Sequence, residues 1–307
     1  MAASSIKLLN TLEWAKRFIF QRNTAMGNFN EPAITSANLT IQTILGAPFS
    51  WGWNRAVTGF ICTPGQQDYT IFNWKSTTSV ALGTVLLDSN GNSQKCITAG
   101  STGGSLPTWN PTTGQITIDG GVTWTNLGPV GLSGGSTNYN FGWMETVSVG
   151  TTNPNGGAFV WKEIETSLCL GVDSVRSRPH HISAQLYDAQ GNITFRLLPA
   201  PDNPYPISIS MQQKAPLFTS LQNTWSPIPD EYGHIYNWGM LALLYMYADD
   251  PRFQVANQKF VGNLLSAVQG LSQTQINIWL NNWQAVTGQQ VTNFSAIQQG
   301  YQGRGST

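Results

Sequence analysis

Apolar residues recur every three or four positions near both ends of the chain, whereas much of the middle alternates apolar and polar residues. The first spacing places side chains on one face of a helix, and the second is typical of a strand with one buried face. Helices are therefore predicted over residues 5–22, 31–45, 229–248, 251–269 and 272–285.

Boundary signals accompany several of these helices. Pro32 suits a first helical turn, because a proline at that position has no backbone hydrogen bond to lose. Asp250-Pro251 combines a capping residue with a first-turn proline, and Gly270 ends that helix. Ser272 and Gln275 have the spacing of a capping box, in which each side chain accepts a hydrogen bond from the other residue's backbone.

Short strands are predicted between the two helical regions. Two turn signals indicate paired strands: Thr63-Pro64-Gly65 between the strands 60–62 and 69–72, and residues 188–192 between the strands 182–187 and 193–198. Further strands are expected at residues 144–149, 158–164 and 207–211.

Residues 75–131 differ in composition from the rest of the chain. Thr, Gly and Ser dominate, and turn signals at 88–92 and 119–121 separate short apolar runs. We interpret this stretch as a small immunoglobulin-like β module inserted into a main domain of residues 1–74 and 132–286, with residues 287–307 as a flexible C-terminal arm. The expected fold class is α+β, with the terminal helices packed on each other as a bundle, a central antiparallel β-sandwich or barrel, and the small all-β module inserted into it.

Charged residues make up 10% of the chain, against about 25% in an average soluble domain. A surface of hydroxyl and amide groups suits large permanent interfaces, where each buried charge would cost desolvation. The formal net charge is zero and Lys or Arg residues form no run, which argues against tight DNA binding but is compatible with a neutral channel through which DNA slides.

The three cysteines indicate a reducing compartment. Cys62, Cys96 and Cys169 are far apart and odd in number, so they match neither a disulfide framework nor a zinc site. The N-terminal residues lack the apolar core of a signal peptide, and the most apolar stretch, 238–248, is too short to span a bilayer. We expect a protein made in the cytoplasm, without a membrane partner.

Four groups of residues could suggest catalysis or metal binding. Residues 131–135 match G-x-S-x-G, but a glycine-rich linker follows where a nucleophile elbow needs a helix. His180 and His181 are adjacent, so on a strand they point to opposite faces.

The other two groups consist of acidic residues and one histidine. Asp230, Glu231 and His234 lie within one helical turn, so His234 and one acid could present two metal ligands on the same helix face. No third ligand is evident, and the acids also suit a helix N-terminus. Glu163 and Glu165 share a strand face, which is more typical of a solvated surface than of a glycosidase pair. We expect no catalytic residue, metal or cofactor; a polysaccharide-degrading enzyme using either glutamate is kept as a hypothesis.

The order of motifs along the chain resembles head-to-tail adaptor (connector) proteins of tailed bacteriophages, the tail tubular A type. The resemblance covers residues 30–74 and 140–270. The motifs that carry it are Ala47–Arg55, Gly65–Tyr69, Phe195–Asp202, Ile207–Met211, Lys214–Pro216, Ile228–Tyr232 and Ala248–Phe253.

The stretch 75–131 is similar to a small β module of many phage structural proteins. The matching residues are Ala99–Gly103, Pro107–Trp109 and Asp119–Pro129. This similarity implies surface decoration or attachment, with Trp109 and Trp124 as candidates for stacking on host glycan. A virion attachment or decoration protein is therefore the alternative hypothesis.

The adaptor resemblance implies a homo-oligomeric ring, a dodecamer, at the head–tail interface of the virion. Its partners would be the portal protein above, a tail nozzle or tail tube protein below, and genomic DNA passing through the centre. Helices would pack laterally between neighbouring subunits. Residues expected at the subunit, portal or tail interfaces are Trp51, Trp53, Tyr232, His234, Trp238, Phe253, Trp279, Trp283 and Phe294.

Overall fold

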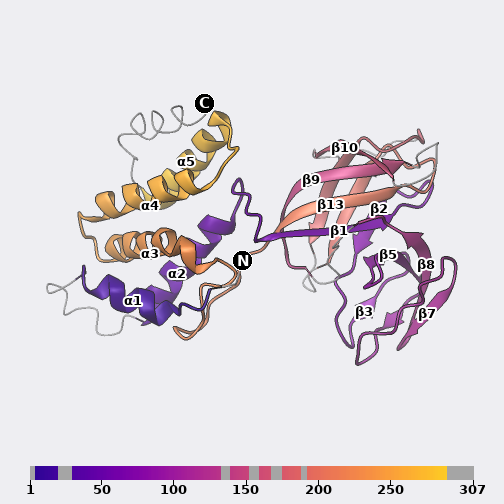
Figure 1. Ribbon diagram of the computed structural model, residues 1–307, viewed down its shortest axis with the longest axis horizontal. Helices are drawn as coiled ribbons and strands as arrows, with labels where there is room; N and C mark the ends of the chain where they lie inside the picture. Colours follow the sequence, from indigo (N-terminus) through magenta and orange to yellow (C-terminus); the bar gives the residue numbers. More distant parts are fainter. Residues whose placement is uncertain are drawn as a thin grey trace. The chain divides into compact units, whose positions relative to one another are not determined.

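The protein combines α-helices with a large, mostly antiparallel sheet (Figure 1). The computed structural model describes residues 4–19, 30–132, 139–151, 159–166, 175–187 and 192–288. The chain divides into two compact units, which we call the helical unit (Met1–Asn54 and Lys214–Thr307) and the β unit (Arg55–Gln213). Segment 133–138, the arm beyond residue 288, Cys169 and Phe294 lie outside the described residues.

The helical unit is built around one largely buried helix, α3. Gly239 lies on this helix, and a Cβ added there would come within 2.6 Å of Thr40 on α2 and 2.8 Å of Phe260 on α4. The absence of a side chain at this position therefore lets three helices approach closely. The helices are α1 (Leu8–Lys16), α2 (Asn30–Leu45), α3 (Gly233–Tyr247), α4 (Phe253–Ala267) and α5 (Gln273–Thr287), and a 3-10 turn (Asp230–Tyr232) precedes α3.

Local sequence signals located four of these helices to within a few residues. The capping box is confirmed: Ser272 Oγ accepts from the Gln275 N–H, and Gln275 Oε1 accepts from the Ser272 N–H. The first helix begins later than residue 5. Residues 5–7 are extended because they pair with a distant segment, where the Trp225 N–H donates to Ile6 O at 3.0 Å. Tertiary pairing therefore competes with the helical pattern there.

The β unit contains an 11-stranded sheet in the order β1-β13-β9-β10-β11-β12-β2-β4-β5-β8-β7. Among the described strands, β10–β11 and β2–β4 pair in parallel and the other neighbours pair antiparallel. The strands are β1 (Arg55–Ile61), β2 (Asp68–Ile71), β4 (Val85–Leu87), β5 (Asn92–Thr98), β7 (Ile116–Asp119), β8 (Val122–Pro129), β9 (Phe141–Thr151), β10 (Val160–Thr166), β11 (His181–Tyr187), β12 (Ile193–Leu198) and β13 (Pro206–Gln213), with β3 (Ser79–Val80) and β6 (Gly100–Ser101) as a separate pair.

Only one of the two predicted strand pairs forms as expected. The antiparallel pairing of β11 with β12 is confirmed. The pairing of 60–62 with 69–72 was wrong, because β1 pairs with β13 and β2 with β12. The turn between them is hydrogen-bonded to a segment distant in sequence, because the Gly65 N–H donates to Pro201 O at 2.7 Å. The two strands instead pack by their side chains, with the rings of Phe60 and Tyr69 4.7 Å apart.

Strands of the segment 75–131 continue the sheet but enclose their own hydrophobic cluster. Ile71 of β2 pairs with Val85 of β4, which joins this segment to the main sheet. Asp119 is buried at the centre and accepts from the indole N–H groups of Trp74 (2.8 Å) and Trp124 (3.3 Å). The cluster consists of Phe72, Val80, Leu86, Cys96, Trp109, Val122 and Trp124.

Candidate interaction surface

Three aromatic side chains meet at the surface of the helical unit and form what we call the surface aromatic cluster. Trp14 lies on α1, Phe18 in the turn that follows, and Trp238 on α3. The ring centroids of Trp14 and Phe18 are 4.9 Å apart, and those of Trp14 and Trp238 are 5.7 Å apart, edge to face. Phe18 is 41% exposed and the two tryptophans are half-buried. The cluster is therefore ordered by its own contacts yet still offers apolar surface.

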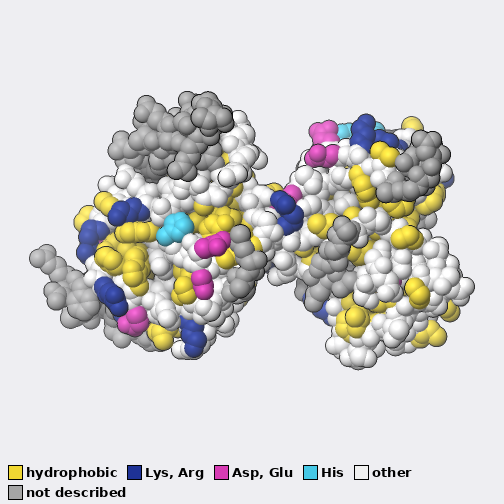
Figure 2. All heavy atoms as spheres, in the orientation of Figure 1, with side chains coloured by type: hydrophobic (Ala, Val, Ile, Leu, Met, Phe, Trp, Pro, Cys, Tyr) yellow, Lys and Arg dark blue, Asp and Glu magenta, His cyan; other side chains and the backbone are white. Residues whose placement is uncertain are grey.

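Helix α4 borders the cluster with one cation and one apolar residue. Lys259 Nζ lies 4.3 Å from the centroid of a Trp238 ring, a cation–π contact. Val255 is one turn earlier on the same helix face and is 58% exposed. Figure 2 shows hydrophobic side chains gathered on one face of this unit, bordered by Lys and Arg side chains. Such a surface suits contact with a protein rather than chemistry on a substrate.

Four residues predicted at interfaces are instead buried within the helical unit itself. Trp51, Phe253, Trp279 and Trp283 are at most 7% exposed and belong to its hydrophobic cluster. The rings of Trp279 and Trp283 stack at 6.1 Å, and Trp283 Nε1 donates to Asn257 Oδ1. These large rings fill the core of the helical unit and leave little exposed surface for a partner.

Three other predicted residues are more accessible. Trp53 and Tyr232 are half-buried and pack against Trp51, with ring centroids 5.2 and 5.3 Å from it. His234 is exposed, with its Nδ1 3.2 Å from Glu231 O. The structure therefore brings Trp53 and Tyr232 together but places neither among the residues of the surface aromatic cluster.

Trp109 and Trp124, the candidates for glycan stacking, are core residues of their module. Trp124 is 0% exposed and Trp109 is 5% exposed, with their rings 6.0 Å apart, edge to face. Stacking on a sugar requires an open ring face. Neither ring presents one in this structure.

The candidate catalytic and metal residues serve structural contacts or lie on the open surface. Asp230 accepts hydrogen bonds from the hydroxyls of Ser4 and Ser5, which hold the pKa of its carboxyl below the ordinary value. Glu163 and Glu165 are exposed, and Glu165 lies 3.4 Å from His181 Nδ1. Among the described residues, no group of three or more His, Cys, Asp or Glu side chains is placed to hold a metal ion.

Two further observations concern the cysteines and the helices. Cys62 and Cys96 are buried and free, and burial raises the pKa of the Cys62 thiol to about 12. In the described part of the chain, no helix is both long enough and apolar enough to cross a membrane.

A scan against protein-family models and a search of curated proteins each returned no match.

Of the three residues in the surface aromatic cluster, only Trp238 is expected at an interface from the sequence. Trp14 and Phe18 are four positions apart, so they extend along one face of a helix and its continuation. The helix predicted over residues 5–22 contains both, but neither is among the residues expected at interfaces. The useful signal was that Leu8, Leu12 and Ala15 already complete the buried face of α1, which leaves Trp14 and Phe18 at its margin.

Proposed function

We propose that this chain is a structural adaptor at the head–tail interface of a tailed bacteriophage and forms a homo-oligomeric ring, a dodecamer. The observation that carries the proposal is the surface aromatic cluster, an ordered apolar surface on a chain with 10% charged residues. Partly exposed rings that their own contacts hold in one arrangement lose little conformational entropy when a partner covers them. Repeated head-to-tail contacts through such a surface close into a ring when the rotation between subunits allows it.

The two units would have different roles in the ring. The helices would form a bundle that packs between neighbouring subunits and against the portal protein. The strands would form a sandwich or barrel facing the tail nozzle or tail tube protein, with residues 75–131 as an inserted module. A net charge of zero supports a channel through which genomic DNA passes without adhering.

The test is to image the purified chain by negative-stain electron microscopy, alone and mixed with the portal protein of the same virion. Rings, or a collar added to the portal, are expected. Sedimentation of the chain over a range of concentrations measures the same association in solution. Monomers in both samples would contradict the adaptor and favour the attachment or decoration alternative, tested by binding of cell-surface polysaccharide.

A pair of surface variants links the association to the cluster. Trp238→Ala with Phe18→Ser should abolish rings while leaving the helical circular dichroism signal unchanged. Leu217→Ser is the matched control, because Leu217 is 70% exposed in the same unit and lies outside the cluster. Rings that persist in the double variant would place the subunit contact elsewhere.

A further inference from the structure

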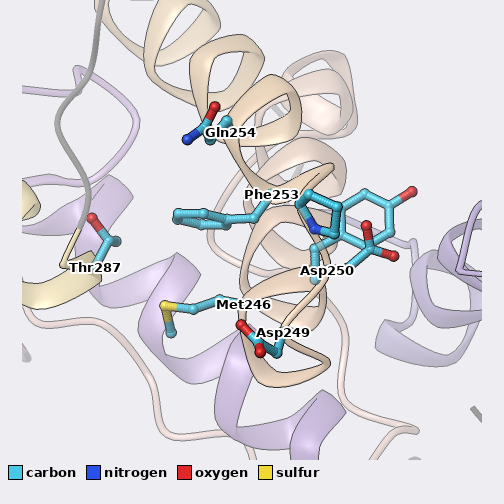
Figure 3. Close-up of a pocket in the computed structure, with 8 residues that line it drawn as sticks. Met246, Asp249, Asp250, Phe253, Gln254 and Thr287 are labelled. Carbon is cyan, nitrogen blue, oxygen red and sulfur yellow. The ribbon is translucent and has the colours of Figure 1, made fainter.

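The pocket drawn in Figure 3 is a crevice between packed helices. It has a volume of about 420 Å³ and lies between the end of α3, the start of α4 and the end of α5. Phe253, which points into it, is 4% exposed and belongs to the hydrophobic cluster of the helical unit. Asp250 at its rim accepts from Arg252 Nε at 2.9 Å, so this ion pair is complete within the chain. Open backbone groups are found instead in the β unit, at one edge of its sheet.

The two edges of the 11-stranded sheet differ in how they are covered. β1 forms one edge, and its Ile61 N–H donates to Ser93 Oγ at 3.0 Å. A Cβ added at Gly59 would come within 2.9 Å of Val130 and Leu132, so side chains also cover this strand. β7 forms the other edge and pairs only with β8 among the described strands. A further strand can therefore pair at β7.

The hairpin of β7 and β8 fixes which backbone groups face the open edge. Residues 120–121 form a two-residue turn, so Asp119 on its β7 side belongs to a hydrogen-bonded pair with β8. Hydrogen-bonded and non-hydrogen-bonded pairs alternate along an antiparallel ladder. Thr117 therefore also bonds to β8, whereas the N–H and C=O groups of Ile116 and Ile118 point away from β8.

The hydrogen bonds around β7 agree with this alternation. The Asn126 N–H donates to Gln115 O at 2.9 Å, which is the next hydrogen-bonded pair along the ladder. Among the described residues, the backbone of neither Ile116 nor Ile118 is hydrogen-bonded to a segment outside the hairpin. Two N–H and two C=O groups are thus available to a second strand.

The side chains of the same two residues extend an uncharged apolar surface. Ile116 is 52% exposed and Ile118 is 71% exposed, and they lie opposite Thr125 and Thr123 of β8 on the outer face of the sheet. Charged side chains, proline and bulges are the usual devices that keep an edge strand from pairing with another chain. β7 has none of them on this face, because its one acid, Asp119, is buried.

We propose that β7 pairs with β7 of a second copy of this chain, in antiparallel orientation, across a two-fold axis at Thr117. Ile116 then lies opposite Ile118 of the second copy, and each such pair exchanges two N–H···O=C hydrogen bonds. Thr117 faces its own counterpart as the non-hydrogen-bonded pair between them, as the ladder with β8 requires. Because neither strand exposes a charge, the two isoleucine surfaces meet without like-charge repulsion.

The size and symmetry of this contact set its role. A four-residue strand makes a small interface, and interfaces below about 1,200 Å² are typical of weak or transient association. The dimer should therefore form only at high protein concentration. A two-fold contact cannot join neighbouring subunits of one cyclic ring, which are related by rotation about the ring axis. The pairing joins two free chains or two rings, and it does not rest on the adaptor function.

The experiment is sedimentation equilibrium of the full chain carrying Trp238→Ala and Phe18→Ser, the changes that remove the proposed ring contact. A dimer that increases with protein concentration is expected. Adding Ile118→Pro should weaken this dimer at least about tenfold, because the change is present in both copies and removes two hydrogen bonds. Pairing with β8 does not use the Ile118 N–H, so the hairpin is retained. Near-ultraviolet circular dichroism checks that the tryptophans of the module remain packed.

Two further variants separate edge pairing from other contacts. Ile118→Lys should also remove the dimer, because a lysine on an edge strand opposes pairing with another chain. Ile97→Lys is the matched control, since Ile97 is 45% exposed on β5, two strands from the edge, and should leave the dimer affinity nearly unchanged. In the otherwise native chain, Ile118→Lys should leave rings intact, so the two contacts are tested separately.

Hydrogen exchange tests the register of the pairing. At high protein concentration the amides of Ile116 and Ile118 should exchange more slowly than at low concentration, because each becomes hydrogen-bonded in the dimer. The amide of Thr117 already bonds to β8 and should not change.

Three results would overturn the proposal. The first is a folded chain that stays monomeric up to its highest soluble concentration. The second is a dimer that persists with Ile118→Pro and Ile118→Lys. The third is a dimer that Ile97→Lys weakens as much as Ile118→Lys does, which would mean that the copies pack through the sheet face and not through its edge.

Discussion

The helical unit and the β unit are assembled from the chain in opposite ways. The β unit is one continuous stretch, 55–213, whereas the helical unit joins residues 1–54 to residues 214–307. Each encloses its own hydrophobic clusters, and Trp225 and Trp124 are among the largest fully buried side chains of the two. Segments that are distant in sequence can therefore share one hydrophobic core. The division into two units also predicts that damage to one core should leave the other unit folded.

The largest effect is expected from Trp225→Ala in the helical unit. The Trp225 ring stacks on Tyr236 at 4.5 Å, and its Nε1 donates to Thr11 Oγ1 at 2.9 Å, so it joins α3 to α1 across the two parts of the unit. Loss of a buried tryptophan costs about 3–5 kcal/mol. Urea unfolding followed by circular dichroism at 222 nm should report this loss. Trp225→Phe should cost less, and equal costs would show that the ring volume is unimportant.

The next effect tests the β unit through Asp119→Asn. The buried carboxylate accepts from two indole N–H groups and from the Gly103 N–H at 2.8 Å. An asparagine replaces one of the two accepting oxygens by an N–H₂ group, which then faces either the indole N–H groups or the Gly103 N–H, and this should destabilise the β unit by about 1–3 kcal/mol. Tryptophan fluorescence should shift during unfolding while the helical signal keeps its midpoint. Asp202→Asn, on the exposed surface, serves as the control.

A smaller effect is expected from Ser272→Ala at the start of α5. The variant removes the hydroxyl that accepts from the Gln275 N–H and should cost about 1 kcal/mol of the helical unit's stability. Because the capping residue is exposed, no cavity forms and the β unit should be unaffected. Chemical denaturation monitored at 222 nm gives the difference. Ser266→Ala removes a hydroxyl that donates to Asn263 O within α4 and caps no helix, so it should change stability less.

The smallest effect concerns acid. The pKa of Asp230 is lowered by hydrogen bonds from Ser4 and then Ser5, so its charged form is favoured in the folded state. This contribution is present above the unfolded carboxyl pKa of about 4 and is lost as the pH falls through the lower folded value. The melting temperature of the helical unit should therefore decline below pH 4. In the Asp230→Asn variant this decline of the melting temperature should be smaller. The remaining decline comes from other acids such as Asp250, whose pKa is also lowered. A decline of equal size in both proteins would exclude a role for Asp230.

The surface aromatic cluster shows where prediction from sequence stops. Trp238, Trp279 and Trp283 all lie on predicted helices, and the adaptor resemblance leads us to expect all three at interfaces. Trp238 lies at the surface, whereas Trp279 and Trp283 are buried because α5 turns both rings inward. Residue type and helical spacing identify the face on which a side chain lies. Whether a neighbouring helix covers that face depends on packing between segments that are distant in sequence.

Local sequence patterns are sufficient to predict the helices α2 to α5, the capping box at Ser272, and the strands β11 and β12 with their antiparallel pairing. These features depend on residues a few positions apart, so the local pattern is sufficient. Three other features follow from the folded arrangement and not from local pattern: β1 pairs with β13, residues 5–7 are extended, and Trp124 is a core residue. Each of these outcomes depends on contacts between distant segments, whose free energy outweighs local preference.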